Sequence, residues 1–118
     1  MEKSNTAIDK CKKFSARILK LSSYLRNFKA QSEISYLIVK SGLNIGSNLC
    51  KVFDNDYNDD IFETFQYALN DAIQTRFYLE SLFESGILSK KQYDSIHPDC
   101  LELISIIKDM LKSIQEGA

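Results

Sequence analysis

The sequence predicts an all-α fold, an up-down-up-down antiparallel four-helix bundle that forms a single domain over residues 1–118. Apolar residues recur with helical spacing along four long segments, which indicates amphipathic helices. One proline and four glycines leave few residues for the many turns of an all-β fold. The links between the segments are short, and short links in bundles join antiparallel neighbours.

The first helix is expected from about Asn5 to Asn27, with Ser4 or Asn5 as its amino-terminal cap. Its apolar stripe consists of Cys11, Phe14, Ile18, Leu21 and Leu25. Residues 28–30 form a short connector to a second helix at 31–51. These two helices should therefore be antiparallel neighbours.

The third helix is expected at 59–84, after a polar turn at 53–59 that is rich in Asp and Asn. Its inward stripe is Ile61, Phe65, Ala68, Ala72, Leu79 and Phe83, and Ser85-Gly86 ends it. The fourth helix starts at Ser89, where Ser89 to Gln92 fits a capping box. Pro98 lies inside its apolar stripe, and because the stripe keeps phase across the proline we expect a kink rather than a restart.

The segment KSGLNIGSNLCKV places Gly42, Gly46 and Cys50 at i, i+4 and i+8, on one side of the second helix. Each glycine inside a helix costs about 1 kcal/mol relative to alanine. We therefore expect a neighbouring helix to come close at Gly42 and Gly46. Asn48 projects at the edge of the same apolar face, where a buried amide needs a hydrogen-bond partner.

The net charge of −1 hides an asymmetry between the two halves of the chain. Residues 1–51 carry ten Lys or Arg against three acids, a net charge of +7. Residues 52–118 carry five Lys or Arg against thirteen acids, a net charge of −8. Such a division indicates complementary pairing within or between subunits, or a basic face for an anionic partner.

Lys13, Arg17, Lys20 and Tyr24 share one face of the first helix, away from its apolar stripe. Cations beside an aromatic ring could contact phosphates and stack on a base, so this face is a candidate for nucleic-acid binding. The alternative, which the pattern favours, is a solvated outer face.

Tyr67, Asp71, Gln74 and Tyr78 line the outer face of the third helix. Two tyrosines on a face away from the core are typical of a subunit interface. The alternative is that they pack under the turn before the helix.

No pattern in the chain indicates catalysis, a metal, a cofactor or a small-molecule substrate. The single histidine, His97, has no convergent ligands at metal-site spacing, and the three cysteines are far apart and read as buried thiols. The expectation is therefore that the protein is not an enzyme. No segment is apolar enough to cross a membrane or serve as a signal peptide, so a cytoplasmic location is expected.

Three segments resemble one known family: KSGLNIGSN at Lys40–Asn48, DIFETFQYALNDAIQTRFYLESLFESGIL at Asp60–Leu88, and the tail from His97. The chain resembles the bacterial four helix bundle proteins, also called 23S rRNA intervening-sequence proteins. The family pattern has a Glu followed by Gly or Ala where this chain has Lys51 and Val52. No role of that glutamate carries over to this chain.

The resemblance implies a homo-oligomer, commonly a pentameric ring, for which no enzymatic activity is established. Some members are encoded within insertions in large-subunit rRNA genes. The expected function is a non-catalytic binding module for RNA or for a nucleic-acid enzyme. The alternative is an accessory protein of a diversity-generating retroelement, as related bundles are, which binds a reverse transcriptase and nucleic acid.

Overall fold

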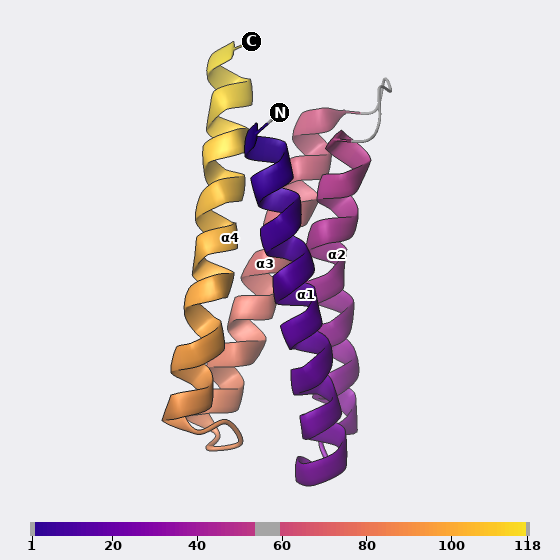
Figure 1. Ribbon diagram of the computed structural model, residues 1–118, viewed down its shortest axis with the longest axis vertical. Helices are drawn as coiled ribbons and strands as arrows, with labels where there is room; N and C mark the ends of the chain where they lie inside the picture. The colour runs from indigo at the N-terminus through magenta and orange to yellow at the C-terminus, as the bar shows by residue number, and fades with distance from the viewer. Residues whose placement is uncertain (1, 54–59, 118) are drawn as a thin grey trace.

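The computed structural model describes residues 2–53 and 60–117, with side chains from Thr6 onward. The helices are α1 (Glu2–Lys29), α2 (Ser32–Phe53), α3 (Ile61–Glu84) and α4 (Lys90–Gly117). Successive helices run in opposite directions and form a rod 47 Å long and 21 Å across (Figure 1). The predicted all-α, up-down-up-down bundle is confirmed, and the described residues contain no strand. Positions 54–59 of the predicted turn, including the predicted start of the third helix, lie outside the described residues.

The two amino-terminal helices are longer than predicted. α1 begins before Ser4 and Asn5, so both are helical and the predicted cap is wrong. α2 extends two residues beyond its predicted end. Between the helices, Ala30 adopts a left-handed conformation with φ of 53°. The N–H of Gln31 donates to the carbonyl of Leu25 at 2.9 Å, which closes the end of α1 as a left-handed cap does.

The ends of α3 and α4 follow the capping rules. Asp60 caps α3, since its Oδ1 accepts from the N–H of Glu63 at 3.1 Å. α3 ends before Gly86, whose φ of 80° suits a residue without a Cβ. The capping box is confirmed: the N–H of Ser89 donates to Gln92 Oε1 at 2.9 Å, and the N–H of Gln92 donates to Ser89 Oγ at 3.1 Å.

One apolar core runs the length of the rod and receives side chains from all four helices. Its largest fully buried side chains include Phe14, Ile18, Leu25, Ile38, Ile45, Leu49, Leu79, Leu82, Leu103 and Ile107. Two members of the predicted α3 stripe depart from it: Ile61 is 45% exposed, and Phe83 is half-buried and stacks on Tyr93. Ile61 is the first residue of α3, at the end of the bundle, and is only partly covered there. α4 continues through Pro98 as one helix.

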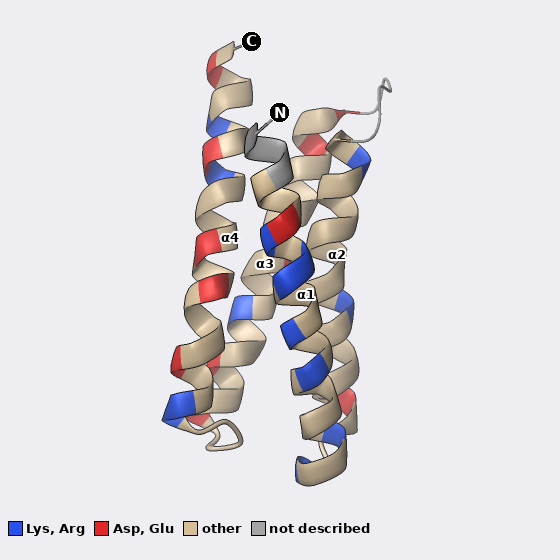
Figure 2. Ribbon diagram, in the orientation of Figure 1, with Lys and Arg blue, Asp and Glu red and all other residues tan. Residues whose placement is uncertain are grey.

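The four helices do not pack equally. α2 packs closely on both α1 and α3, and α3 packs closely on α4, whereas α1 and α4 make far fewer contacts with each other. Each half of the chain is one helical hairpin, so the two oppositely charged halves of the sequence become two sides of the rod. Lys and Arg positions gather on α1, and several Asp and Glu positions lie along α4 beside it (Figure 2).

Candidate interaction surfaces

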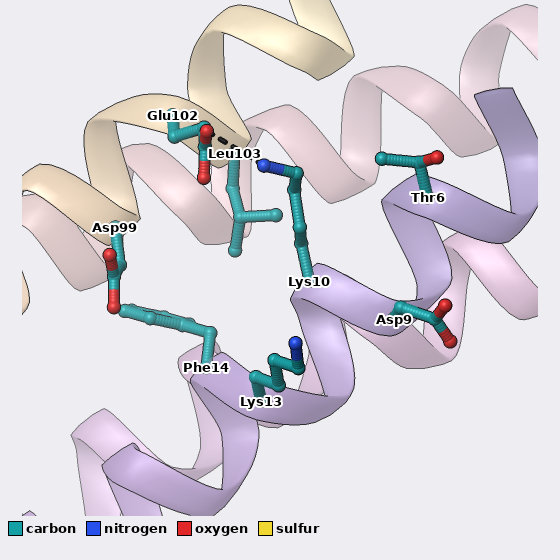
Figure 3. Close-up of a pocket in the computed structure, with 8 residues that line it drawn as sticks. All are labelled: Thr6, Asp9, Lys10, Lys13, Phe14, Asp99, Glu102 and Leu103. Atoms are coloured by element: carbon teal, nitrogen blue, oxygen red, sulfur yellow. Dashed lines mark hydrogen bonds and ion pairs between the residues drawn. The ribbon is translucent and has the colours of Figure 1, made fainter.

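The residues of the predicted nucleic-acid face lie along the line where α1 meets α4, here called the α1/α4 seam. An open groove follows this seam. Its upper part is lined by residues that include Lys13, Phe14, Asp99 and Leu103 (Figure 3). Its lower part is lined by residues that include Arg17, Lys20, Tyr24, Leu88 and Ser95.

Arg17 makes three hydrogen bonds from α1 to α4 along this seam. Its Nη1 donates to Asp99 Oδ2 at 2.6 Å and to the carbonyl of Ser95 at 2.8 Å, and its Nη2 donates to Ser95 Oγ at 2.5 Å. Higher up, Lys10 Nζ donates to Glu102 Oε2 at 2.8 Å (Figure 3). Arg17 therefore holds α4 and is not a free cation for a phosphate.

The other members of the predicted nucleic-acid face remain at the surface. Lys13 and Lys20 are exposed, and neither forms an ion pair with an acid of the described residues. Tyr24 is half-buried, and its ring packs at 5.8 Å from the ring of Phe28 and lies under the ammonium of Lys29. Asp99 and Glu102 of α4 line the upper part beside Lys10 and Lys13, so the charge there is mixed in sign.

The predicted subunit-interface residues of α3 divide into two kinds. Tyr67 is 52% exposed, and its hydroxyl donates to Glu63 Oε1 at 2.7 Å, a bond that raises the pKa of Tyr67. Gln74 is also exposed. Tyr78 is half-buried and packs against the core. Only Tyr67 and Gln74 are therefore open to a partner in the monomer, while Asp71 is engaged with α2.

A hydrogen bond between Asn48 and Asp71 connects the glycine segment of α2 to the predicted interface face of α3. The Nδ2 of Asn48 donates to Asp71 Oδ2 at 3.0 Å, which gives the amide its partner and links α2 to α3. Burial raises the pKa of Asp71, and the bond from Asn48 opposes this shift in part. One turn away, Thr75 Oγ1 donates to Ser41 Oγ at 2.8 Å in the buried interface between the same helices.

The two glycines of α2 lie against α1. A Cβ on Gly42 would be 3.1 Å from Ile18 Cγ2, and a Cβ on Gly46 would be 3.3 Å from the Cβ of Cys11. A Cβ at either position would be in tight contact, so the neighbouring side chain of α1 would have to shift by a few tenths of an ångström. Outside this contact lies a mostly apolar groove, here called the α1/α2 groove, lined by residues that include Ile8, Ala16, Leu19, Leu43, Gly46 and Cys50.

Several exposed apolar side chains were not predicted from the sequence, among them Leu19 (50% exposed), Tyr36 (66%), Leu37 (41%), Phe77 (63%) and Leu101 (42%). The signal for Phe77 was present, since it is a large aromatic residue three positions after Gln74, on the polar side of its helix. Helical periodicity identifies continuous apolar stripes, so it does not identify single apolar residues on a polar face.

Two thiols and the single histidine are the remaining groups that the sequence analysis considered for chemistry. Burial raises the pKa of the thiols of Cys11 and Cys100 to about 12, so both are protonated near neutral pH. His97 Nε2 lies 3.0 Å from Glu80 Oε2, and its ring stacks on Tyr93, which are packing contacts. Within residues 6–53 and 60–117, no three His, Cys, Asp or Glu side chains are placed to share a metal ion. No helix in the described ranges combines the length and apolarity needed to cross a bilayer.

Comparisons with known proteins agree with the resemblance drawn from the sequence. No protein-family model and no curated protein match the chain. A solved structure does: a protein of unknown function from the S23 ribosomal protein family of Bacteroides thetaiotaomicron, with a TM-score of 0.88 and 29% identity. The match covers 93% of this chain and 98% of that one. The chain therefore has the fold of a member of the S23 (23S rRNA intervening-sequence) family and is similar to it in sequence over nearly its whole length.

Proposed function

We propose that this protein is a non-catalytic, homo-oligomeric four-helix bundle of the 23S rRNA intervening-sequence type that acts as a binding module for RNA or for a nucleic-acid enzyme. The observation that carries the proposal is the separation of charge between the two hairpins. The described side chains of α1 and α2 include nine Lys or Arg and two acids, whereas those from Asp60 to the end of α4 include five and ten. A rod with opposite charge on opposite sides is complementary to other copies of itself.

Exposed apolar side chains support self-association. Leu19 lies on the basic side of the rod, and Phe77 and Leu101 lie on the acidic side. Large exposed apolar side chains on both sides of a small protein favour an interface on each. The subunit number of five rests on the family resemblance.

The absence of catalysis is likewise part of the proposal. The two buried thiols are held protonated, and the single histidine is engaged with Glu80. Among the described residues neither thiol is hydrogen-bonded to a histidine or a carboxylate, and no hydroxyl or thiol is hydrogen-bonded to His97.

Nucleic-acid binding is supported by the free cations of α1. Lys12, Lys13 and Lys20 are exposed and make no ion pair with a described acid. Asp99 and Glu102 on the neighbouring helix weaken the attraction for phosphate, so a single subunit should bind weakly and an oligomer more strongly. The accessory role in a retroelement would call for a more uniformly cationic surface than this one.

Static light scattering of the native protein at micromolar concentration tests the assembly. We expect a mass several times the 13.5 kDa of one chain, and five times for the ring that the resemblance implies. A mass of 13.5 kDa over the whole concentration range would contradict the proposal.

Gel-shift titrations with a structured RNA at low and moderate salt test the binding. The variant Lys13→Ala/Lys20→Ala should bind more weakly, because two phosphate contacts are lost. The matched control is Lys90→Ala/Lys91→Ala, two exposed lysines at the start of α4, and it should bind like the parent. RNA binding that is absent at low salt, or equal in both variants, would exclude this face.

A further inference from the structure

We infer that the α1/α2 groove is the docking site for a second copy of this chain, which presents the surface around Phe77 and Leu101. This inference rests on the proposed self-association and specifies the two surfaces that meet. The contact is heterologous, because each subunit uses a different surface on each side.

The receiving surface is the α1/α2 groove. It is open to solvent and mostly apolar, and Leu19 at its edge is half-exposed in the monomer. Gly46 lines this groove where α1 comes close to α2, and as a glycine it places no side chain in it. A large apolar side chain from outside could therefore reach both helices at once.

The inserted surface lies on the opposite side of the rod. Glu80 on α3 and His97 on α4 form a bridge of 3.0 Å across the outer edge of these helices. Phe77 lies one turn from Glu80, and Leu101 lies one turn from His97 in the same direction along the rod. Both are exposed and lie on the same side of the bridge, and we refer to the two together as the Phe77–Leu101 patch.

The two surfaces lie at the same height along the rod. Thr75 of α3 donates to Ser41 of α2 at 2.8 Å, so these two residues are level. Gly42, which follows Ser41, packs on Ile18 of α1, and Leu19 follows Ile18. Phe77 is two residues from Thr75 and is therefore level with Leu19 within about one turn.

The height of Leu101 is fixed in the same way. It follows Cys100, whose Sγ is 3.5 Å from the carbonyl of Ala72 on α3. The residue before Ala72 accepts the bond from Asn48, within the segment of α2 that lines the groove. A rotation about an axis parallel to the rod preserves height, so a copy related by such a rotation can bring the patch to the groove without sliding.

Charge selects this pairing over the symmetric one. Lys12 lines the α1/α2 groove, on the basic hairpin, whereas Glu80 lies one turn from Phe77 on the acidic hairpin. Two grooves face to face would bring like charges together, which is unfavourable. The groove against the patch brings opposite charges together.

The experiment uses two variants of exposed residues and their mixture. The patch variant is Phe77→Ser/Leu101→Ser, and the groove variant is Ala16→Glu/Leu19→Glu. The control is Phe28→Ser, which removes a 77% exposed aromatic side chain at the end of α1, away from both surfaces. Each variant is sized by light scattering at the concentration at which the native protein is oligomeric, and its fold is checked by circular dichroism.

We expect each of the two variants to be monomeric and the control to keep the native mass. Mixed in equal amounts, the two variants should form a dimer of about twice 13.5 kDa and nothing larger, since the pair retains one intact groove and one intact patch. If both variants keep the native mass, or the mixture stays monomeric, these surfaces are not the interface, although the protein self-associates. If the native protein is itself monomeric, the proposed self-association fails instead.

Discussion

Gly42→Ala should destabilise the bundle, although alanine is the better helix former. Propensity alone would stabilise α2 by about 1 kcal/mol. The added Cβ, however, would lie 3.1 Å from Cγ2 and 3.2 Å from Cγ1 of Ile18. Ile18 is fully buried and branched at Cβ, so it has no alternative rotamer into which to move freely. Overpacking of this kind costs about 1–3 kcal/mol, which leaves a net loss of about 1 kcal/mol.

Gly46→Ala is the matched comparison on the same helix. Its Cβ would meet a single atom, the Cβ of Cys11 at 3.3 Å, at the edge of the α1/α2 groove. Overpacking should then offset anywhere from none to all of the gain in propensity. We expect a stability equal to that of the parent or up to about 1 kcal/mol higher.

Urea unfolding followed by far-UV circular dichroism measures both variants, at one protein concentration because association adds to stability. A control in the Ile18→Ala background removes the obstructing atoms, so Gly42→Ala should there stabilise by about 1 kcal/mol. If Gly42→Ala stabilises the parent by the full propensity difference, α1 and α2 are not in close contact at this glycine.

Three further outcomes follow from single side chains. Arg17→Gln should lower stability by about 1 kcal/mol in urea unfolding, since bonds of 2.6 and 2.8 Å across the α1/α4 seam are lost from a partly exposed guanidinium. Lys10→Gln is the control and should change little, because Lys10 makes a single bond across the same seam at a similar exposure. Ser89→Ala should cost about 1 kcal/mol by the same measurement, because it removes the cap of α4. Burial raises the folded-state pKa of Asp71, so its charged form is penalised above that pKa and the penalty disappears as the pH falls through it. Asp71→Asn should therefore be more stable than the parent at pH 7, and the advantage should shrink on acidification; an advantage that is independent of pH would assign the effect to packing instead.

Much of the fold could be predicted from local patterns. The box at Ser89 and Gln92, the stop at Gly86 and the apolar stripes each depend on residues a few positions apart, and local rules decide them. The wrong predictions concern residues whose burial depends on how much of a neighbouring helix covers them. Ile61 continues the periodicity of α3 but lies at its first turn, where too little of the bundle remains to cover it.

The candidate surfaces could be predicted less well, for the same reason. Arg17 stands with other cations on one face of α1, yet its partner Asp99 is 82 positions away, and only the packing of α4 brings the two together. The exposure of Phe77 likewise depends on how α3 is rotated against α4. Periodicity assigns a residue to a face, but it does not say which helix covers that face.

The sparse packing between α1 and α4 also affects the order in which the helices assemble and open. Nearly all the interhelical packing joins helices that are consecutive in the chain, and the seam alone joins the first helix to the last. Contacts between neighbours in sequence form early and fast, whereas closing the loop between the chain ends costs the most entropy for the fewest contacts. The two hairpins should therefore assemble first and the seam close last. In the native state the seam should be the first part to open, so the amide hydrogens of α1 should exchange with solvent sooner than those of α2.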